Sequence, residues 1–319
     1  MRRDQFLKSM AAFAAASSLP LSALAAVNLK MMIPANPGGG WDGTGRALGK
    51  ALQEGGLASS IAYENKGGAA GVIGLAQFYT ASKGDPNALM VMGAVMLGGM
   101  ITSKPPVQLS QVTPIARLTT EYGVFVLPEN SPLKTMKDVV EQLKKDPGSV
   151  KWGGGSRGST EHIAAAMIAR EVGVDASKIN YVPFRGGGEA TAAILGGNVT
   201  VGGSGYSEFQ QYIEAGKMKA IALTSPTRLK GINVPTLKEQ GINVELGNWR
   251  GVYGAAGITP EQRKALTDLV VKATKTKTWA EALEKNNWTP AVLAGKEFED
   301  FVDNSFASLR ATMVKAGMI

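Results

Sequence analysis

The sequence predicts an α/β fold made of two lobes that face each other across a cleft. Apolar runs typical of strands are followed repeatedly by glycine-rich turns and then by helical patterns, in both halves of the chain. Two strand-like or proline-rich segments, 128–132 and 248–253, can carry the chain between the halves. We therefore expect residues 26–127 plus 248–319 to form the first lobe and residues 128–247 to form the second.

The composition is typical of a soluble globular protein that binds a small anion. Of the 319 residues, 44% are hydrophobic and 19% are charged, and the net charge is +8. No dense basic stripe interleaved with aromatic residues is present, so we expect no nucleic-acid partner. Cysteine is absent, which excludes disulfides and thiolate metal sites, and His162 is the one histidine, so we expect no metal site.

The first 25 residues have the pattern of an export signal. Arg2 and Arg3 precede an apolar, alanine-rich run that ends in the small-x-small sequence Ala23-Leu24-Ala25. The run is too short to span a bilayer, and no later segment is apolar enough to do so. We expect cleavage near Ala25, a mature chain that begins at Ala26, and a location in the periplasm. A general secretion signal and a twin-arginine signal both fit the pattern.

The elements of the first lobe alternate between strand and helix. We expect strands at 29–33, 61–64, 89–93, 115–120 and 123–127. We expect helices at 44–52, before the stop at Gly55-Gly56, and from the glycine-rich turn 67–71 to about Ser82. Three helices near the C-terminus complete this lobe, at 260–275, 279–285 and 297–315.

The second lobe repeats the same alternation. We expect strands at 150–152, 181–183, 199–202 and 219–223. We expect helices at 136–145, from Ser159 to Val172, up to Leu195, and after Tyr206. Ser159 is a suitable N-cap and Gly173 a suitable stop for the second of these helices.

The turn from Asn36 to Arg46 organises the predicted cleft. It follows a strand and leads into a helix, an arrangement that points backbone N–H groups and the positive end of a helix dipole at one place. We expect Gly39, Gly40 and Trp41 to lie in one wall, where Trp41 either covers a ligand or anchors the lobes. Asp42 either stabilises the helix start or accepts a ligand hydrogen bond.

A dinucleotide-dependent oxidoreductase is the alternative from another functional class. Segments 38–43 and 153–158 both match G-x-G-x-x-G, and Glu64 lies about twenty residues after the first match. Such matches are weak in a chain with 40 glycines. Export away from the cytoplasmic nicotinamide pool, and the presence of Pro37 and Trp41, also argue against this function. We expect no cofactor.

The opposite wall is expected to contain polar side chains from the turns of the second lobe. Ser156 and Ser204 are small hydroxyl donors, and Arg157 and Arg185 can pair with a carboxylate. Ser159 and His162 are neighbours on one helix, but no sequence signal supplies an acid to orient the histidine. We therefore predict no catalytic residues.

Several motifs together resemble one family. They lie at 37–42, 67–71, 153–159, 181–189, Arg228, 234–241 and 249–251, and so cover essentially the whole mature chain. With them the chain resembles the substrate-binding receptors of tripartite tricarboxylate transporters, the Bug family of extracytoplasmic solute receptors. The triple glycine followed by Trp41-Asp42, and the Arg185-to-Glu189 stretch, are most similar to the tricarboxylate-binding branch.

The resemblance implies a two-lobed periplasmic binding protein of type II, which closes on its ligand like a flytrap. It implies a monomeric, non-enzymatic receptor that captures a citrate-like di- or tricarboxylate and delivers it to membrane permease subunits. A C4 dicarboxylate, an aromatic acid, or a sensory partner in place of the transporter would fit the same pattern.

The family motif transfers to particular positions of this chain. The ligand-binding residues that it implies are Gly39, Gly40, Trp41, Asp42, Gly68, Ala69, Ser156, Arg157, Arg185, Gly186 and Ser204. The chain departs from the family pattern at 67–71, where many members have Gly-Ala-Gly-Gly. It also departs at 202–204, where many members carry an acid. The missing acid favours a more anionic ligand.

Overall fold

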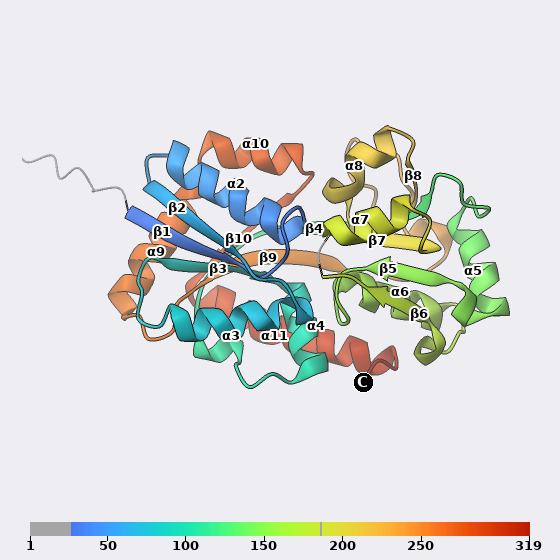
Figure 1. Ribbon diagram of the computed structural model, residues 1–319, viewed down its shortest axis with the longest axis horizontal. Coiled ribbons are helices and arrows are strands. Elements are labelled where there is room, and N and C mark those ends of the chain that lie inside the picture. Colours follow the sequence, from blue (N-terminus) through green and yellow to red (C-terminus); the bar gives the residue numbers. More distant parts are fainter. Residues whose placement is uncertain (1–26, 186) are drawn as a thin grey trace, which may run out of the picture.

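The computed structural model describes residues 27–185 and 187–319, which form two lobes that lie side by side (Figure 1). The expected export signal and Gly186 lie outside these residues. Within them, no helix is both long and apolar enough to pass through a membrane.

The first lobe is a mixed sheet with helices packed on it (Figure 1). Strands β1, β2 and β3 are parallel, and β9 and β4 continue the sheet, β9 antiparallel to β3 and β4 antiparallel to β9. All six residues of β3 are buried, as expected for a strand covered on both faces. The strands are β1 (Val27–Ile33), β2 (Ala58–Asn65), β3 (Ala88–Gly93), β4 (Thr113–Pro128), β9 (Gly247–Gly254) and β10 (Thr289–Ala294). The helices are α2 (Gly40–Glu54), α3 (Val72–Ala81), α4 (Ala94–Ser103), α9 (Pro260–Ala273), α10 (Lys277–Lys285) and α11 (Gly295–Lys315).

The second lobe is built around parallel strands that are joined to the end of β4. Separate apolar clusters fill it, one around the fully buried Trp152 and another around Phe209. The strands are β5 (Lys151–Gly154), β6 (Asn180–Pro183), β7 (Val201–Gly205) and β8 (Met218–Leu223). The helices are α5 (Met136–Lys145), α6 (Thr160–Glu171), α7 (Gly187–Leu195) and α8 (Tyr206–Glu214).

Two strands, β4 and β9, connect the lobes. As far as Tyr122, β4 pairs with β9, and from Gly123 onward it pairs with β7 and β8 of the second lobe. The separate strands predicted at 115–120 and 123–127 are therefore one continuous strand, because both parts find antiparallel partners. The chain changes lobes inside β4, slightly before the predicted boundary at residue 127. The extended segment predicted at 248–253 is confirmed as β9.

Three further elements differ from the sequence-based expectation. Helix α2 begins at Gly40 and not at Thr44, because Gly39 adopts the extended N-cap conformation. Helix α4 is not predicted by the sequence pattern, because it is almost uniformly apolar and buried and lacks a polar face. Strand β10 is not predicted either, because it is short, lies beside β4 and is only partly buried.

The lobes pack closely where glycines meet. A Cβ atom placed on Gly98 of α4 would lie 1.9 Å from the carbonyl oxygen of Gly158, in the loop before α6. A Cβ atom on Gly39 would lie 3.1 Å from the backbone nitrogen of Gly187. Asn36 of the first lobe also donates a hydrogen bond of 2.8 Å to Glu189 on α7. The two glycine contacts leave no room for side chains. Together with the hydrogen bond from Asn36, they define a closed arrangement of the lobes.

We expect Gly98→Ala to force the lobes apart, since the added methyl group would overlap the backbone oxygen of Gly158. The stability should fall by about 1 to 3 kcal/mol, the usual cost of overpacking. Small-angle X-ray scattering should show a larger radius of gyration, and the melting temperature should fall. Gly43→Ala is the matched control, because nothing lies within 4 Å of the place that its added methyl group would take on α2. Identical scattering and melting for both variants would contradict the close packing.

Candidate functional site

A small cavity lies between the lobes, at the N-terminal end of α2. Its volume is about 90 Å³, which is well below the roughly 300 to 1,000 Å³ of sites for drug-sized ligands. A dinucleotide cannot enter a space of this size. The closed arrangement therefore suits a small solute.

The structure brings most of the predicted site residues to this cavity. From the first lobe come Gly39, Gly40, Trp41 and Gly68, and from the second lobe come Ser156, Arg185 and Ser204. Asp42, Ala69 and Arg157 do not line it, so any contact of these three with a ligand stays a prediction. Gly186 lies outside the described residues.

The start of α2 forms the first wall. Gly39 is the N-cap, and Gly40 and Trp41 begin the helix, so their backbone N–H groups lie at the positive end of its dipole. Thr44 closes this turn by donating a hydrogen bond of 2.8 Å to the carbonyl oxygen of Gly40. The indole nitrogen of Trp41 is buried and has no partner among the described residues. This wall can donate hydrogen bonds to an anion.

Asp42 is directed toward its own lobe. Its carboxylate accepts hydrogen bonds from the backbone of Gly38 (3.1 Å), from Arg46 Nε (3.0 Å) and from Asn65 Nδ2 (3.0 Å). Burial by itself would raise the pKa of Asp42, but these hydrogen bonds outweigh burial and lower the pKa. Of the two roles expected for Asp42, stabilising the helix start is the one that its contacts explain.

The turns of the second lobe form the opposite wall. Ser159 caps α6, as predicted, by accepting a hydrogen bond from the backbone of His162. Ser204, at the end of β7, is 7% exposed and lies on the cavity. The guanidinium of Arg185 is exposed and makes no hydrogen bond or ion pair within residues 27–185 and 187–319, so it is free to meet an anion at the rim.

His162 is held as a neutral ring. Burial, with a contribution from Arg157, lowers the pKa of His162 to about 4. Its Nδ1 accepts a hydrogen bond of 3.0 Å from the backbone of Gly158, and its ring lies against Tyr181. These contacts explain His162 as a residue of the first turn of α6 that holds the loop before the helix in place.

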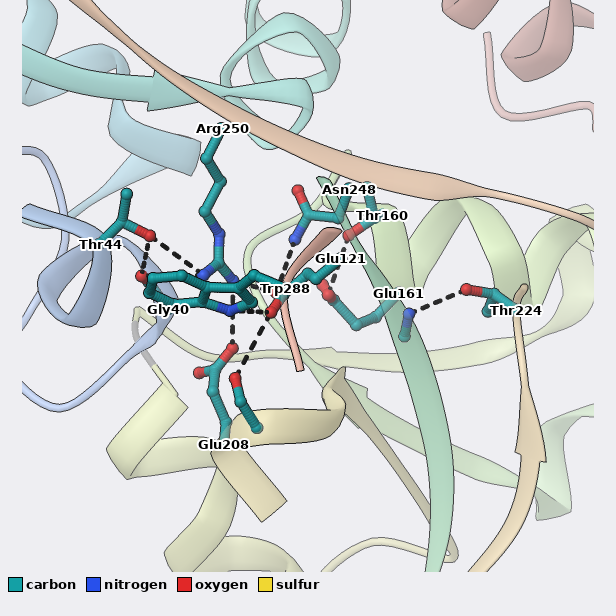
Figure 2. A network of polar contacts seen from close by, with 12 residues as sticks. Gly40, Thr44, Glu121, Thr160, Glu161, Glu208, Thr224, Asn248, Arg250 and Trp288 are labelled. Atoms are coloured by element: carbon teal, nitrogen blue, oxygen red, sulfur yellow. Dashed lines mark hydrogen bonds and ion pairs between the residues drawn. The ribbon is translucent and has the colours of Figure 1, made fainter. Parts of the chain in front are cut away.

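A buried ionic network that the sequence does not predict reaches the cavity through Arg250 and Glu208. Figure 2 shows its contacts. Arg250 of β9 is 2% exposed and forms an ion pair with Glu121 of β4. The same guanidinium donates to the carbonyl oxygen of Gly40 (3.0 Å) and to Thr44 Oγ1 (3.2 Å), and it lies 3.6 Å from Glu208 of α8. Arg250 therefore joins both crossing strands to α2 of one lobe and to α8 of the other.

Glu121 is satisfied by several donors besides Arg250. Trp288 Nε1 donates to it at 2.9 Å, and Ser207 and Asn248 donate at 3.4 Å each (Figure 2). Burial raises the pKa of Glu121 in spite of the charge of Arg250.

Glu208 lines the cavity and has fewer hydrogen-bond and ion-pair partners than Glu121. Burial, followed by the negative charge of Glu121, raises the pKa of Glu208 to about 7. Glu161, at the start of α6, also lines the cavity and adds to this effect. The motif 249–251 contains Arg250, but no regular spacing in the sequence connects it to the distant acids 121, 161 and 208.

Comparison with known proteins identifies the family. Residues 46–318 match the model of the tripartite tricarboxylate transporter family receptor, TctC. The chain belongs to this family. The TctC family consists of periplasmic substrate-binding receptors and not of enzymes.

A sequence relative and two solved structures illustrate the similarity. The protein BugT of Bordetella pertussis is 25% identical over 283 residues, which cover 86% of this chain and 84% of BugT. The structure of the periplasmic binding protein BugD has a TM-score of 0.81 at 22% identity and covers 91% of this chain and 98% of its own. MatC of Rhodopseudomonas palustris, solved with bound malate, has a TM-score of 0.76 at 19% identity. The match covers 89% of this chain and 98% of the MatC chain. These structures confirm the two-lobed α/β fold expected from the sequence.

We expect Glu208→Gln to change how stability depends on pH. The raised pKa means that the folded protein holds the Glu208 proton more tightly than the unfolded chain does. The contribution of Glu208 to stability is therefore present at low pH and is lost as pH rises toward about 7. The variant lacks this loss, so its stability relative to wild type should increase from about pH 5 to about pH 7.

Urea unfolding across this pH range measures the difference between the two proteins. His162 has a lowered pKa and so gives the opposite slope, but it is present in both proteins and cancels. Glu214→Gln, on the exposed side of α8, is the control for removing a charge from this helix. A difference between wild type and Glu208→Gln that does not change with pH would contradict the raised pKa.

Proposed function

We propose that this TctC-family receptor captures a small organic carboxylate in the cavity between its lobes and delivers it to the permease of a tripartite transporter. The observation that supports this most directly is the composition of the two walls. The N-terminus of α2 presents backbone N–H groups from one lobe, and Arg185, Ser156 and Ser204 lie across from it on the other. Backbone N–H groups, guanidinium groups and hydroxyls are the usual partners of a carboxylate.

Capture proceeds by a shift of population from an open to a closed arrangement. A ligand favours closure because both walls reach it only when the lobes are closed. The direct contacts between the lobes, such as the hydrogen bond from Asn36 to Glu189, add to the stability of the closed form. The permease then recognises the closed surface.

The remaining parts of the proposal follow from the sequence and the family. The chain is exported, its signal is cleaved near Ala25, and it acts as a monomer. Citrate, a C4 dicarboxylate and an aromatic acid are the candidate ligands. The malate in MatC is a carboxylate of the second kind and supports this class of ligand.

A thermal-shift screen of the chain from Ala26 onward tests the function. A carboxylate present at a hundred times its dissociation constant should stabilise the protein by about 2.7 kcal/mol, which is visible as a rise in melting temperature. NAD and FAD are the controls for the oxidoreductase alternative and should cause no shift. A shift with a nucleotide and none with any carboxylate would contradict the receptor.

We expect Arg185→Met to weaken carboxylate binding about tenfold, since a charge-assisted hydrogen bond contributes about 1.5 to 3 kcal/mol. Arg170→Met is the matched control, because Arg170 is also an exposed arginine of the second lobe, in the last turn of α6, and does not line the cavity. Isothermal titration calorimetry with the tightest carboxylate of the screen measures both. Equal losses in the two variants would show that Arg185 acts through the overall charge and not through contact.

A further inference from the structure

The buried part of the cavity carries more negative than positive charge. Among the described residues that line it, the glutamate and arginine side chains are Glu161, Glu208, Arg185 and Arg250. Arg185 is exposed at the rim, whereas the other three are buried or half-buried. The net charge next to a bound solute therefore depends on which groups the guanidinium of Arg250 pairs with.

The charge of Arg250 is already compensated. Its Nη2 forms an ion pair with Glu121, at a shorter distance than the 3.6 Å that separates it from Glu208. Its Nη1 is occupied by Gly40 and Thr44 of α2. Arg250 thus directs both of its terminal nitrogens at protein groups, and its Nε is the one nitrogen of the guanidinium without a partner among the described residues.

Glu161 and Glu208 are the carboxylates of the cavity with few hydrogen-bond or ion-pair partners. Glu161 accepts one hydrogen bond, from Thr160, at its Oε1 (Figure 2), and its Oε2 has no partner among the described residues. Glu208 has a hydrogen bond with Ser204 and a long ion pair with Arg250, at 3.6 Å. A ligand with two or three carboxylates would bring further negative charge next to these groups, and like charges at short range repel strongly where water is excluded.

Asn248 supplies an independent sign of a hydrogen-bond donor in the ligand. The residue is 6% exposed and lines the cavity, and its Oδ1 has no hydrogen-bond partner among the described residues. Its Nδ2 donates to Glu121, so the oxygen is directed away from that carboxylate (Figure 2). A buried acceptor without a partner costs free energy, and an N–H group of a solute would remove that cost.

The same cavity also offers donors. Trp41 Nε1 is buried and unpartnered among the described residues, and the guanidinium of Arg185 is free at the rim. Donors suit a carboxylate, whereas Glu161, Glu208 and Asn248 Oδ1 suit a protonated nitrogen. The two kinds of group match a solute that carries both charges.

We propose that the solute is a small zwitterion with one carboxylate and one protonated amine, and that Glu161, Glu208 and Asn248 receive the amine. This rests on the proposed function, since the carboxylate is bound by the walls described above. It reverses the expectation from residues 202–204, where the missing acid favoured a more anionic ligand. The acidic charge of the site comes from Glu161 and Glu208 instead.

Matched pairs of ligands test the proposal in calorimetric titrations of the chain from Ala26 onward. Glutarate and 4-aminobutyrate differ by the exchange of one terminal carboxylate for an ammonium group, and succinate and 3-aminopropionate differ in the same way. The α-amino acids glycine, alanine and serine extend the series. We expect the amino member of the best-fitting pair to bind at least about tenfold more tightly than the dicarboxylate.

Glutamine variants then test whether Glu161 and Glu208 contact the ammonium group of the ligand. Glu161→Gln and Glu208→Gln each keep the shape of the side chain and should reduce the preference for the amino ligand about tenfold, with a smaller change for the dicarboxylate. Glu214→Gln, elsewhere on α8, is the control and should leave the preference unchanged. Melting temperatures of all three variants check that they are folded.

The pH dependence provides a readout that a purely structural role would not change. Glu208 faces Glu121 of β4, Arg250 of β9, Glu161 of α6 and Ser204 of β7. The affinity for the amino ligand should rise from about pH 6 to about pH 8 as Glu208 loses its proton. The affinity for a dicarboxylate should fall over the same range, and Glu208→Gln should remove both trends.

The outcomes separate this proposal from the receptor function. If dicarboxylates or citrate bind and their amino counterparts do not, the zwitterion proposal is wrong and the proposed function as a carboxylate receptor is retained. If diamines such as 1,4-diaminobutane bind and no carboxylate does, the carboxylate receptor is wrong. Binding of the amino ligands that is unchanged in both glutamine variants would overturn the assignment of Glu161 and Glu208.

Discussion

The ion pair between Arg250 and Glu121 is the interaction on which the arrangement of the lobes depends. Both residues lie on the strands that cross between the lobes, and both are nearly inaccessible to solvent. Removing two charges from water is costly, and the cost is offset only when additional hydrogen bonds satisfy the remaining donors and acceptors. Trp288, Asn248 and the start of α2 provide these bonds. The network therefore fixes the place where the first wall of the cleft begins.

The glycines of the cleft serve two different physical purposes. At Gly39 and Gly40 they bring the start of α2 close to Gly187 and to the guanidinium of Arg250, where a Cβ atom on Gly40 would lie 2.0 Å from Nη2. At Gly98 and Gly158 they allow the backbones of the two lobes to touch. An excess of glycine at turns thus reflects close approach of backbone to backbone as well as access for a ligand.

Local signals account for the elements that the sequence predicts well. The cap at Ser159 and the strand β9 can be found because a cap and a short segment of strand-forming residues such as Trp249, Val252 and Tyr253 are properties of a few neighbouring residues. The sequence places the start of α2 at Thr44 because three glycines are poor helix formers, and tertiary contacts with Arg250 override that preference. Helix α4 lacks an amphipathic pattern because both of its faces are buried, so periodicity cannot reveal it.

The sequence by itself determined the alternation of strands and helices, the family and the glycine-rich turns that form the walls, because motifs of a few neighbouring residues encode them. The tertiary structure decided the charge of the cleft. Glu121, Glu208 and Arg250 lie at distant positions of the sequence, and no local pattern connects them. Only the pairing of β4 with β9 and the packing of α8 beside them bring these charges together, and their mutual burial then sets the electrostatic character of the site.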